Sequence, residues 1–328
     1  MLVLSRADVE ALLDLEQLIE ALAAAMADLS AGQASLPARV AAVIGDRDAF
    51  LASMVAYSPA GRALAAKLMS VFPHNAGGPL PTHQGVICAF DPTSGEPVAL
   101  MDATYITAMR TAAGSALATR LLARPDAALM AVLGTGVQAR AHARLVPRVR
   151  RLREVRVAGR DPAAARALAM ELAGESEVPV LAVDAYADGL RDADIVCATT
   201  HSVDPVVRRE WLAPGVHVNS VGYNPAGREI DDATVAAAFV VVESRAAALA
   251  PFPSGANDLT QPLRDGVIGA DHVRAELGEL VAGTRAGRSS PEQITLYKSV
   301  GVAVQDAAAA ALVLAAAERR GAGRTIRL

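Results

Sequence analysis

The chain has 328 residues, of which 52% are hydrophobic and 20% charged, and its formal net charge is −4. This length allows two domains with cores of their own, and the composition is that of a globular protein. The slight negative charge, without a basic stripe that carries interleaved aromatic residues, argues against nucleic acid and against an anionic membrane as partners.

The amino terminus and the two cysteines predict a cytoplasmic protein. The opening MLVLSRADVE carries charge too early for a secretory signal peptide. Cys88 and Cys197 both lie in apolar, strand-like stretches, and two buried thiols are not a disulfide framework, which fits a reducing cytosol. The most apolar late stretch, residues 301–317, contains Gln305 and Asp306 and is too short to span a bilayer comfortably. We predict a buried, alanine-rich helix there.

The first third of the chain predicts an α+β unit. A helix start at residues 5–8 is followed by apolar residues at helical spacing, and a helical hairpin is plausible. Beyond it the texture changes to short strands, with a turn at residues 91–95. We place these strands at residues 39–44, 49–56, 63–71, 84–90 and 97–101. A helix over residues 101–122 then leads into a second unit.

Residues 127–144 predict a strand, a glycine-rich turn and a helix. The apolar run 129–133 stops at the string Gly134-Thr135-Gly136-Val137-Gln138-Ala139. Gly134 permits a tight turn, Gly136 removes the side chain that would block a phosphate, and Ala139 lets helix and strand pack closely. We therefore predict that a dinucleotide pyrophosphate binds here, the alternative being a glycine-rich turn without a ligand.

The same alternation of apolar runs and helical periods continues after this motif. Further strands are predicted at residues 155–158, 179–183, 195–198, 216–221 and 239–242, with helices near 162–172 and through 190. Short apolar runs of this kind predict a parallel sheet covered on both faces. Residues 255–287 read as loop-rich, and the chain from Tyr297 onward as the terminal helix.

The predicted fold class is α/β, with a Rossmann-type doubly wound parallel sheet over residues 119–301. The terminal helix is apolar on more than one face and must be covered. If it packs on the N-terminal unit, residues 1–118 and 302–328 form a discontinuous α+β domain.

Several short strings occur here in the order in which a known family has them. They are Leu36-Pro37-Ala38-Arg39, Lys67-Leu68, Pro81-Thr82-His83-Gln84, Thr107-Ala108-Met109-Arg110-Thr111-Ala112-Ala113, the glycine string, Asn219-Ser220-Val221-Gly222 and Tyr297-Lys298-Ser299-Val300-Gly301. On these strings the chain resembles the ornithine cyclodeaminase and mu-crystallin family. The resemblance implies a nicotinamide cofactor on the Rossmann domain and a homodimer formed through the discontinuous domain, which also binds substrate. Family members include cyclodeaminases, alanine dehydrogenases and reductases of cyclic imino acids.

The substrates of such a family bring a carboxylate, which the fork of an arginine meets with two parallel hydrogen bonds. By resemblance Arg39, Lys67 and Arg110 hold this carboxylate, and Lys67 and Arg110 are also catalytic candidates. A surface cation is the alternative for each of the three. The remaining implied substrate contacts are Thr82, His83, Arg228 and Val300. His83 is equally well explained as a structural histidine.

The implied cofactor contacts are thirteen residues, most of them at strand ends. They are Gly134, Thr135, Gly136, Val137, Gln138, Gly159, Arg160, Asp161, Thr199, Thr200, Val221, Gly222 and Ser299. The threonine pair is also explained as an ordinary helix N-cap.

The end of the second predicted strand favours NADP(H). Domains that prefer NAD offer a carboxylate there to the ribose, about 20 residues after the glycines. Here Gly159 makes room and Arg160 offers a partner for a 2′-phosphate. Asp161 keeps NAD(H) possible, because it either reaches the ribose or caps the following helix.

Two departures from the family pattern bear on the reaction. Cyclodeaminases carry a proton-transferring Asp at the catalytic position where this chain has Asn224. An amide cannot take up a proton at neutral pH, so Asn224 cannot perform this proton transfer. Cyclodeaminases also carry a Glu thirteen residues before the lysine, where this chain has Met54. We therefore predict an NAD(P)H-dependent oxidoreductase that reduces a cyclic ketimine such as pyrroline-2-carboxylate, or that runs the reverse oxidation of an amino acid.

Two other functions remain open from the sequence. One is a cyclodeaminase-type lyase, and the other is a non-catalytic small-molecule or NADPH-binding protein of the mu-crystallin kind. We expect no metal site, because no histidine pair has ligand spacing and no Cys-x-x-Cys occurs.

Overall fold

The computed structural model describes residues 1–75, 77–251 and 253–327. The chain forms two compact units: unit 1 comprises Met1–Arg110 and Gly301–Leu328, and unit 2 comprises Thr111–Val300. Unit 1 is discontinuous because the C-terminal segment returns to it. The units divide at residues 110/111 and 300/301, where the sequence placed the divisions at 118/119 and 301/302. Within the described ranges, no helix is long and apolar enough to cross a membrane.

Unit 1 is built on a seven-stranded sheet in the order β15-β1-β6-β5-β4-β3-β2. Its strands are β1 (Leu2–Leu4), β2 (Val40–Ile44), β3 (Ala49–Ser58), β4 (Ala63–Val71), β5 (His83–Phe90), β6 (Pro97–Asp102) and β15 (Arg324–Thr325). Strands β2 to β6 form an antiparallel meander. The five strands predicted from alternation are therefore all present, with ends that differ by two residues at most.

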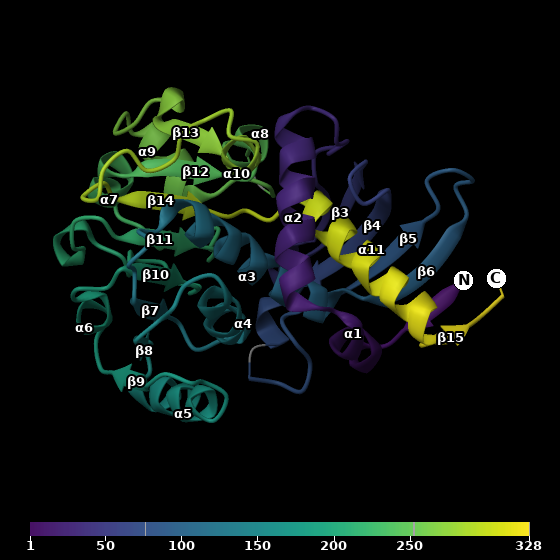
Figure 1. Ribbon diagram of the computed structural model, residues 1–328, viewed down its shortest axis with the longest axis horizontal. Coiled ribbons are helices and arrows are strands. Elements are labelled where there is room, and N and C mark those ends of the chain that lie inside the picture. The colour runs from purple at the N-terminus through teal and green to yellow at the C-terminus, as the bar shows by residue number, and fades with distance from the viewer. Residues whose placement is uncertain (76, 252, 328) are drawn as a thin grey trace. The chain divides into compact units, whose positions relative to one another are not determined.

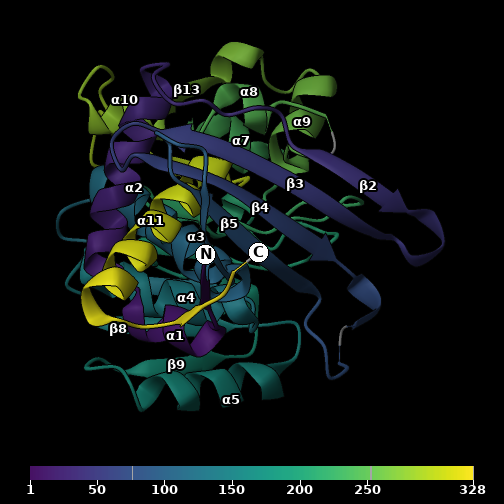
Figure 2. The ribbon, with the colours of Figure 1, turned by 90° about the vertical axis from the view of Figure 1, so that its right-hand side faces the viewer.

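Three helices of unit 1 pack against one another and the sheet. They are α1 (Arg6–Leu12), α2 (Leu15–Ser30) and α11 (Ala303–Arg320). Ser5 begins α1 with a capping box to Asp8, and Asp14 caps α2, so the helical hairpin follows from local capping. Helices α2 and α11 lie side by side, and α11 packs on β3, β4 and β5 (Figures 1 and 2). The predicted packing of the terminal helix on the N-terminal unit is confirmed.

Unit 2 is an eight-stranded parallel sheet in the order β13-β12-β14-β11-β10-β7-β8-β9. Its strands are β7 (Leu129–Leu133), β8 (Glu154–Ala158), β9 (Val180–Val183), β10 (Ile195–Ala198), β11 (His217–Ser220), β12 (Phe239–Val242), β13 (Val273–Glu276) and β14 (Thr295–Lys298). Helix α3 (Ala103–Leu122) continues from unit 1 into unit 2. The other helices are α4 (Val137–Leu145), α5 (Pro162–Ala173), α6 (Tyr186–Leu190), α7 (Asp232–Ala237), α8 (Arg245–Ala248), α9 (Asn257–Arg264) and α10 (Leu277–Val281).

Both faces of this sheet are buried, as the apolar runs predict. Along β7, Leu129, Ala131 and Leu133 enter one core cluster. Met130 and Val132 enter a second cluster on the other face. Since successive side chains of a strand point to opposite faces, each cluster fills one side of the sheet. The doubly wound α/β fold is confirmed.

Three predictions about local structure were wrong. Tyr297 does not begin the terminal helix but lies in strand β14, between β11 and β12. Gly301, at φ +71°, separates this strand from α11, which begins at Ala303. Residues 255–287 contain β13 and two short helices instead of loop alone. Cys88 is only half-buried, whereas Cys197 is buried as expected.

Candidate functional site

Lys67 is a buried, charged side chain that lies between two apolar side chains on the neighbouring strands of the unit 1 sheet. On β4 it pairs with Met54 of β3 and with Ile87 of β5, on the sheet face that α11 covers. Its side chain is 1% exposed, and Asp306 in the first turn of α11 accepts a hydrogen bond from Nζ at 2.8 Å. This charged side chain thus has a carboxylate partner supplied from the far end of the sequence.

Arg110 binds the same carboxylate. Its Nε donates to Asp306 Oδ1 at 3.1 Å, and its Nη1 donates to Gln305 Oε1 at 2.9 Å. A Cβ on Gly301 would lie 2.6 Å from Arg110 Nη1, so the guanidinium requires glycine there. The carbonyl oxygen of Gly301 accepts from Arg39 Nη2 at 2.8 Å. We call Arg39, Lys67 and Arg110 the cation cluster; all three lie around the start of α11.

Two buried cations of the cluster, Lys67 and Arg110, share the carboxylate of Asp306. Lys67, Arg110 and Asp306 are buried, which makes an unbalanced charge costly unless an anion neutralises it. The pKa of Lys67 is lowered to about 8, chiefly by burial and also by Arg110 and Arg39, while Asp306 opposes the shift. Such a site can bind a carboxylate, and an ammonium of this acidity can donate a proton near neutral pH.

Lys67 and Lys298 are the only lysines among the 31 lysine and arginine residues, and both are buried. Lys298 ends β14, and its Nζ donates to Gly222 O at 2.7 Å, Asp258 Oδ2 at 2.9 Å and Ser220 Oγ at 3.0 Å. An ammonium has three donors, so this lysine is fully satisfied.

Lys67 has a smaller set of acceptors. Among the described residues these are Asp306 and, at 3.5 Å, Thr107 Oγ1. One N–H of Lys67 therefore remains for a ligand.

In unit 2, the glycine loop before α4 leaves space for a phosphate. Gly134 has φ +113°, and a Cβ there would lie 2.8 Å from Thr199 Oγ1, so the turn requires glycine for packing. A Cβ on Gly136, the N-cap of α4, would meet nothing within 4 Å. The α4 N-terminus offers unpaired backbone N–H groups to an anion in this open space. The residues present thus fit the pyrophosphate of a dinucleotide.

A buried network that the sequence analysis missed ties the strand ends next to this loop. The Glu229 carboxylate accepts from Thr200 Oγ1 at 2.7 Å, from Gly222 N at 2.8 Å and from Ser220 Oγ at 2.9 Å. A Cβ on Gly222 would lie 2.3 Å from Glu229 Cδ. Burial raises the pKa of Glu229, while Lys298 lowers it. The signal available in the sequence was Lys298 itself, one of two lysines in an arginine-rich chain.

The ends of β8 and β14 place the other proposed cofactor contacts. Asp161 caps α5 by accepting from Ala163 N at 2.8 Å, which is the capping role that the sequence left open. Arg160 beside it is exposed. A Cβ on Gly159 would lie 2.8 Å from Thr135 Cγ2, so packing alone already requires glycine there. Ser299 Oγ donates to Glu243 Oε1 at 2.6 Å.

The structure places five proposed substrate or catalytic residues outside the cation cluster. In unit 2, Arg228 is held by both oxygens of Asp232. The Asn224 amide is used within its own loop, where Nδ2 donates to His201 O at 2.9 Å and Oδ1 accepts from Ala226 N at 2.8 Å.

Thr82 directly precedes β5 of unit 1, and His83 begins this strand. There the Thr82 hydroxyl lies 3.1 Å from Nδ1 of His83, which is exposed. Val300 precedes Gly301, and its backbone N–H donates to Glu243 Oε2 at 3.1 Å.

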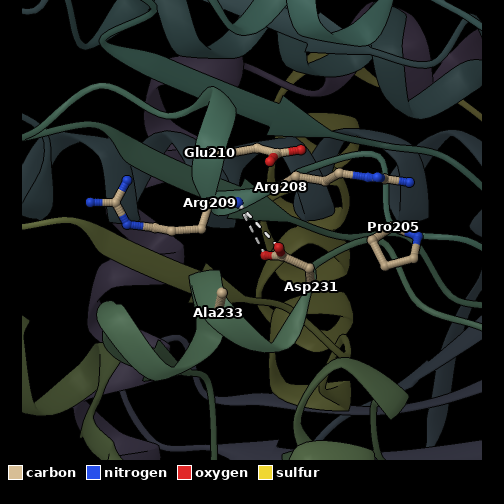
Figure 3. A pocket seen from close by; sticks show the side chains of 6 residues that line it. All are labelled: Pro205, Arg208, Arg209, Glu210, Asp231 and Ala233. Carbon is tan, nitrogen blue, oxygen red and sulfur yellow. Dashed lines mark hydrogen bonds between the residues drawn. The ribbon is translucent and has the colours of Figure 1, made fainter.

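The open depressions of unit 2 lie at other residues. One, of about 490 Å³, is lined by Pro205, Arg208, Arg209, Glu210, Asp231 and Ala233. Figure 3 shows the guanidinium groups of Arg208 and Arg209 pointing in opposite directions, so they do not converge on one anion. A second, of about 590 Å³, includes Arg124, which is paired with Asp194. Neither has the chemistry of the cation cluster, and the described residues contain no group of three or more metal-ligating side chains.

Comparison with known proteins identifies relatives along the whole chain. The sequence profile of the ornithine cyclodeaminase/mu-crystallin family matches residues 1–321. The chain is 34% identical over 328 residues to a pyrroline-2-carboxylate reductase of Bacillus cereus, with 99% of each protein covered.

Solved structures agree with this relationship. A pyrroline-2-carboxylate reductase of Thermococcus litoralis, in complex with NADH and L-proline, is similar at a TM-score of 0.95 and 36% identity, covering 99% of this chain and 100% of that one. An archaeal alanine dehydrogenase dimer with bound NAD is similar at a TM-score of 0.92 and 29% identity, covering 100% and 99%.

Proposed function

The chain belongs to the ornithine cyclodeaminase/mu-crystallin family, and we propose that it reduces the C=N bond of a cyclic imino acid such as pyrroline-2-carboxylate. The observation that carries this proposal is the cation cluster, in which the carboxylate of Asp306 holds Lys67 and Arg110 while Arg39 donates to the carbonyl oxygen of Gly301. An imino acid brings a carboxylate that a guanidinium can bind through two hydrogen bonds, and its ring nitrogen needs a proton donor close by.

In the proposed reaction, Arg110 and Arg39 hold the substrate carboxylate while the free N–H of Lys67 points to the imine nitrogen. A bound nicotinamide supplies the hydride that the imine carbon receives. Lys67 gives one proton to the nitrogen, so hydride and proton together convert C=N into CH–NH. A pKa of about 8 leaves Lys67 mostly protonated at neutral pH but acidic enough to act.

Two residues favour reduction over cyclodeamination. Met54 faces Lys67 across the β3–β4 pair, so the position where cyclodeaminases carry a glutamate has no ionisable group. Asn224 cannot accept a proton, and both ends of its amide are engaged in the loop. We therefore expect no proline and ammonia from L-ornithine.

We propose NADP(H) as the preferred cofactor, with NAD(H) possible. Asp161 is used as the cap of α5, while Arg160 beside it is exposed and offers a partner for a 2′-phosphate. NAD(H) stays an alternative because two related structures contain bound NADH or NAD. Steady-state kinetics with both cofactors decide the preference, and a clear advantage of NADH would overturn this assignment.

We further propose that the protein is a homodimer through the outer face of the unit 1 sheet. Leu51, Val55, Leu68 and Val86 lie on this face by strand register and are 40–47% exposed. A contiguous row of exposed aliphatic side chains on a sheet is typical of a surface that another protein chain buries. A related alanine dehydrogenase is a dimer, and a second copy is the occupant that fits.

Consumption of NAD(P)H with a panel of imines tests the proposed activity. The panel pairs cyclic imino acids of different ring size with the same rings lacking the carboxylate. We expect turnover of the imino acids and little of the others. Tight dinucleotide binding without turnover of any imino acid would instead indicate a binding protein, and release of ammonia from ornithine would indicate a lyase.

A further inference from the structure

Asp306 is the carboxylate that Lys67 and Arg110 share, and it lies on a different element from either of them. We propose that Asp306 is the positioning residue of this site: it holds the Lys67 ammonium and the Arg110 guanidinium on the two oxygens of one carboxylate, so that both present donors to one substrate. The catalytic consequence rests on the proposed imine reduction, whereas the positioning itself is measurable without turnover.

The geometry gives each oxygen of Asp306 one cation. Oδ2 accepts from Lys67 Nζ at 2.8 Å, and Oδ1 accepts from Arg110 Nε at 3.1 Å. The neighbouring residue Gln305 adds a neutral acceptor for Arg110 Nη1 at 2.9 Å. Arg110 uses its Nε edge for Asp306, which turns the end of the guanidinium away from the carboxylate. Gly301, which precedes α11, leaves room for that end.

The charges around Lys67 determine the sign of the effect. Burial, Arg110 and Arg39 all disfavour the ammonium, and Asp306 is the group that favours it. The strands on either side contribute only Met54 and Ile87, which carry no charge. Removing the charge of Asp306 should therefore lower the pKa of Lys67, and adding a carboxylate at Gln305 should raise it.

The sequence makes this measurable at a single site. With lysines only at positions 67 and 298, protein labelled with ¹³C and ¹⁵N lysine gives two side-chain signals. Lys67→Met assigns them, and Lys298 serves as an internal reference. The variants are Asp306→Asn, Gln305→Glu and, as a matched control, Asp28→Asn. Asp28 is a unit 1 carboxylate that accepts from Ser58 Oγ and Ala60 N and touches no cation of the cluster.

We expect Lys67 in the native protein to titrate near pH 8. Asp306→Asn should lower this midpoint by about 1 to 3 units, the usual effect of a close opposite charge. Gln305→Glu should raise it, and Asp28→Asn should leave it in place. Opposite shifts from two neighbouring substitutions cannot come from a general loss of stability. A Lys67 midpoint in Asp306→Asn that equals the native one, in folded protein, overturns the proposal.

Kinetics separate this proposal from the proposed function. If the native enzyme reduces imino acids, the pH at which kcat/KM begins to fall should move with the Lys67 midpoint in each variant. If the midpoints shift but no imino acid is reduced, Asp306 positions the cluster and the proposed reaction is wrong. If imino acids are reduced and the midpoints do not shift, the reaction stands and the role of Asp306 is wrong.

Discussion

Replacement of Arg110 by methionine most directly tests the proposed binding site of the substrate carboxylate. Methionine keeps an apolar stem beside Gly301 but removes the guanidinium. Asp306 retains Lys67 as a partner, and Gln305 Oε1 still accepts from Val302 N at 3.2 Å, so the surrounding side chains keep hydrogen bonds. The variant should therefore fold, at a lower melting temperature.

The expected loss in kcat/KM follows from the hydrogen bonds between Arg110 and the substrate carboxylate that the variant cannot make. A hydrogen bond to a charged group contributes about 1.5 to 3 kcal/mol, and the arginine fork offers two. Losing about 3 kcal/mol of transition-state stabilisation lowers kcat/KM by about 100-fold or more. Arg110→Lys keeps a charge without the fork and should fall between the native enzyme and the methionine variant.

The assay compares pyrroline-2-carboxylate with pyrroline, the same ring without the carboxylate. Arg110→Met should impair the first substrate far more than the second. Arg6→Met, which removes an exposed unit 1 arginine paired with Glu10, serves as the control and should change neither. Equal losses for both substrates, with folding verified by a thermal melt, would refute the placement of the carboxylate at Arg110.

Five further predictions concern separate features of the molecule. Because the protonated form of Lys67 is the active one and its pKa is about 8, kcat/KM should be level below that pH and decline above it; a profile still rising at pH 9.5 would contradict this role. Gly136→Val should raise the KM for the cofactor without changing the melting temperature, because its side chain enters open space. Gly134→Ala should instead destabilise the fold by about 1 to 3 kcal/mol from strain at positive φ, and an unchanged melt would count against the packing argument. Arg160→Ala should raise the KM for NADPH and leave that for NADH nearly unchanged, and equal changes would remove the 2′-phosphate assignment. Leu68→Asp should convert the proposed dimer to monomers in sedimentation or light scattering, and a persistent dimer would place the interface elsewhere.

Local sequence signals were sufficient for much of the fold. The strand, turn and helix at residues 129–145 follow from an apolar run that ends at glycines, and the hairpins of unit 1 follow from alternation between turns. Strand β14 was missed because Lys298 makes a central strand look polar. Its partner Asp258 lies 40 residues earlier, in a stretch without a strong periodic signal.

Only part of the candidate site could be predicted from the sequence. The family resemblance suggested Arg39, Lys67 and Arg110 as carboxylate ligands, but not what holds them in place. The pairing of Lys67 with Met54 depends on strand register, and its contact with Asp306 joins residues 239 positions apart. Such long-range partners leave no periodic or local trace, so the positioning carboxylate and the network of Glu229 emerge only from the fold.

Transfer of deuterium from the cofactor tests the central claim most directly. The native enzyme is given pyrroline-2-carboxylate and nicotinamide cofactor deuterated at the transferable C4 position, and the product is analysed by mass spectrometry and proton NMR. Hydride delivery to the imine carbon predicts proline with one deuterium at Cα. Cofactor that binds without being oxidised, or proline without the label, would contradict the account.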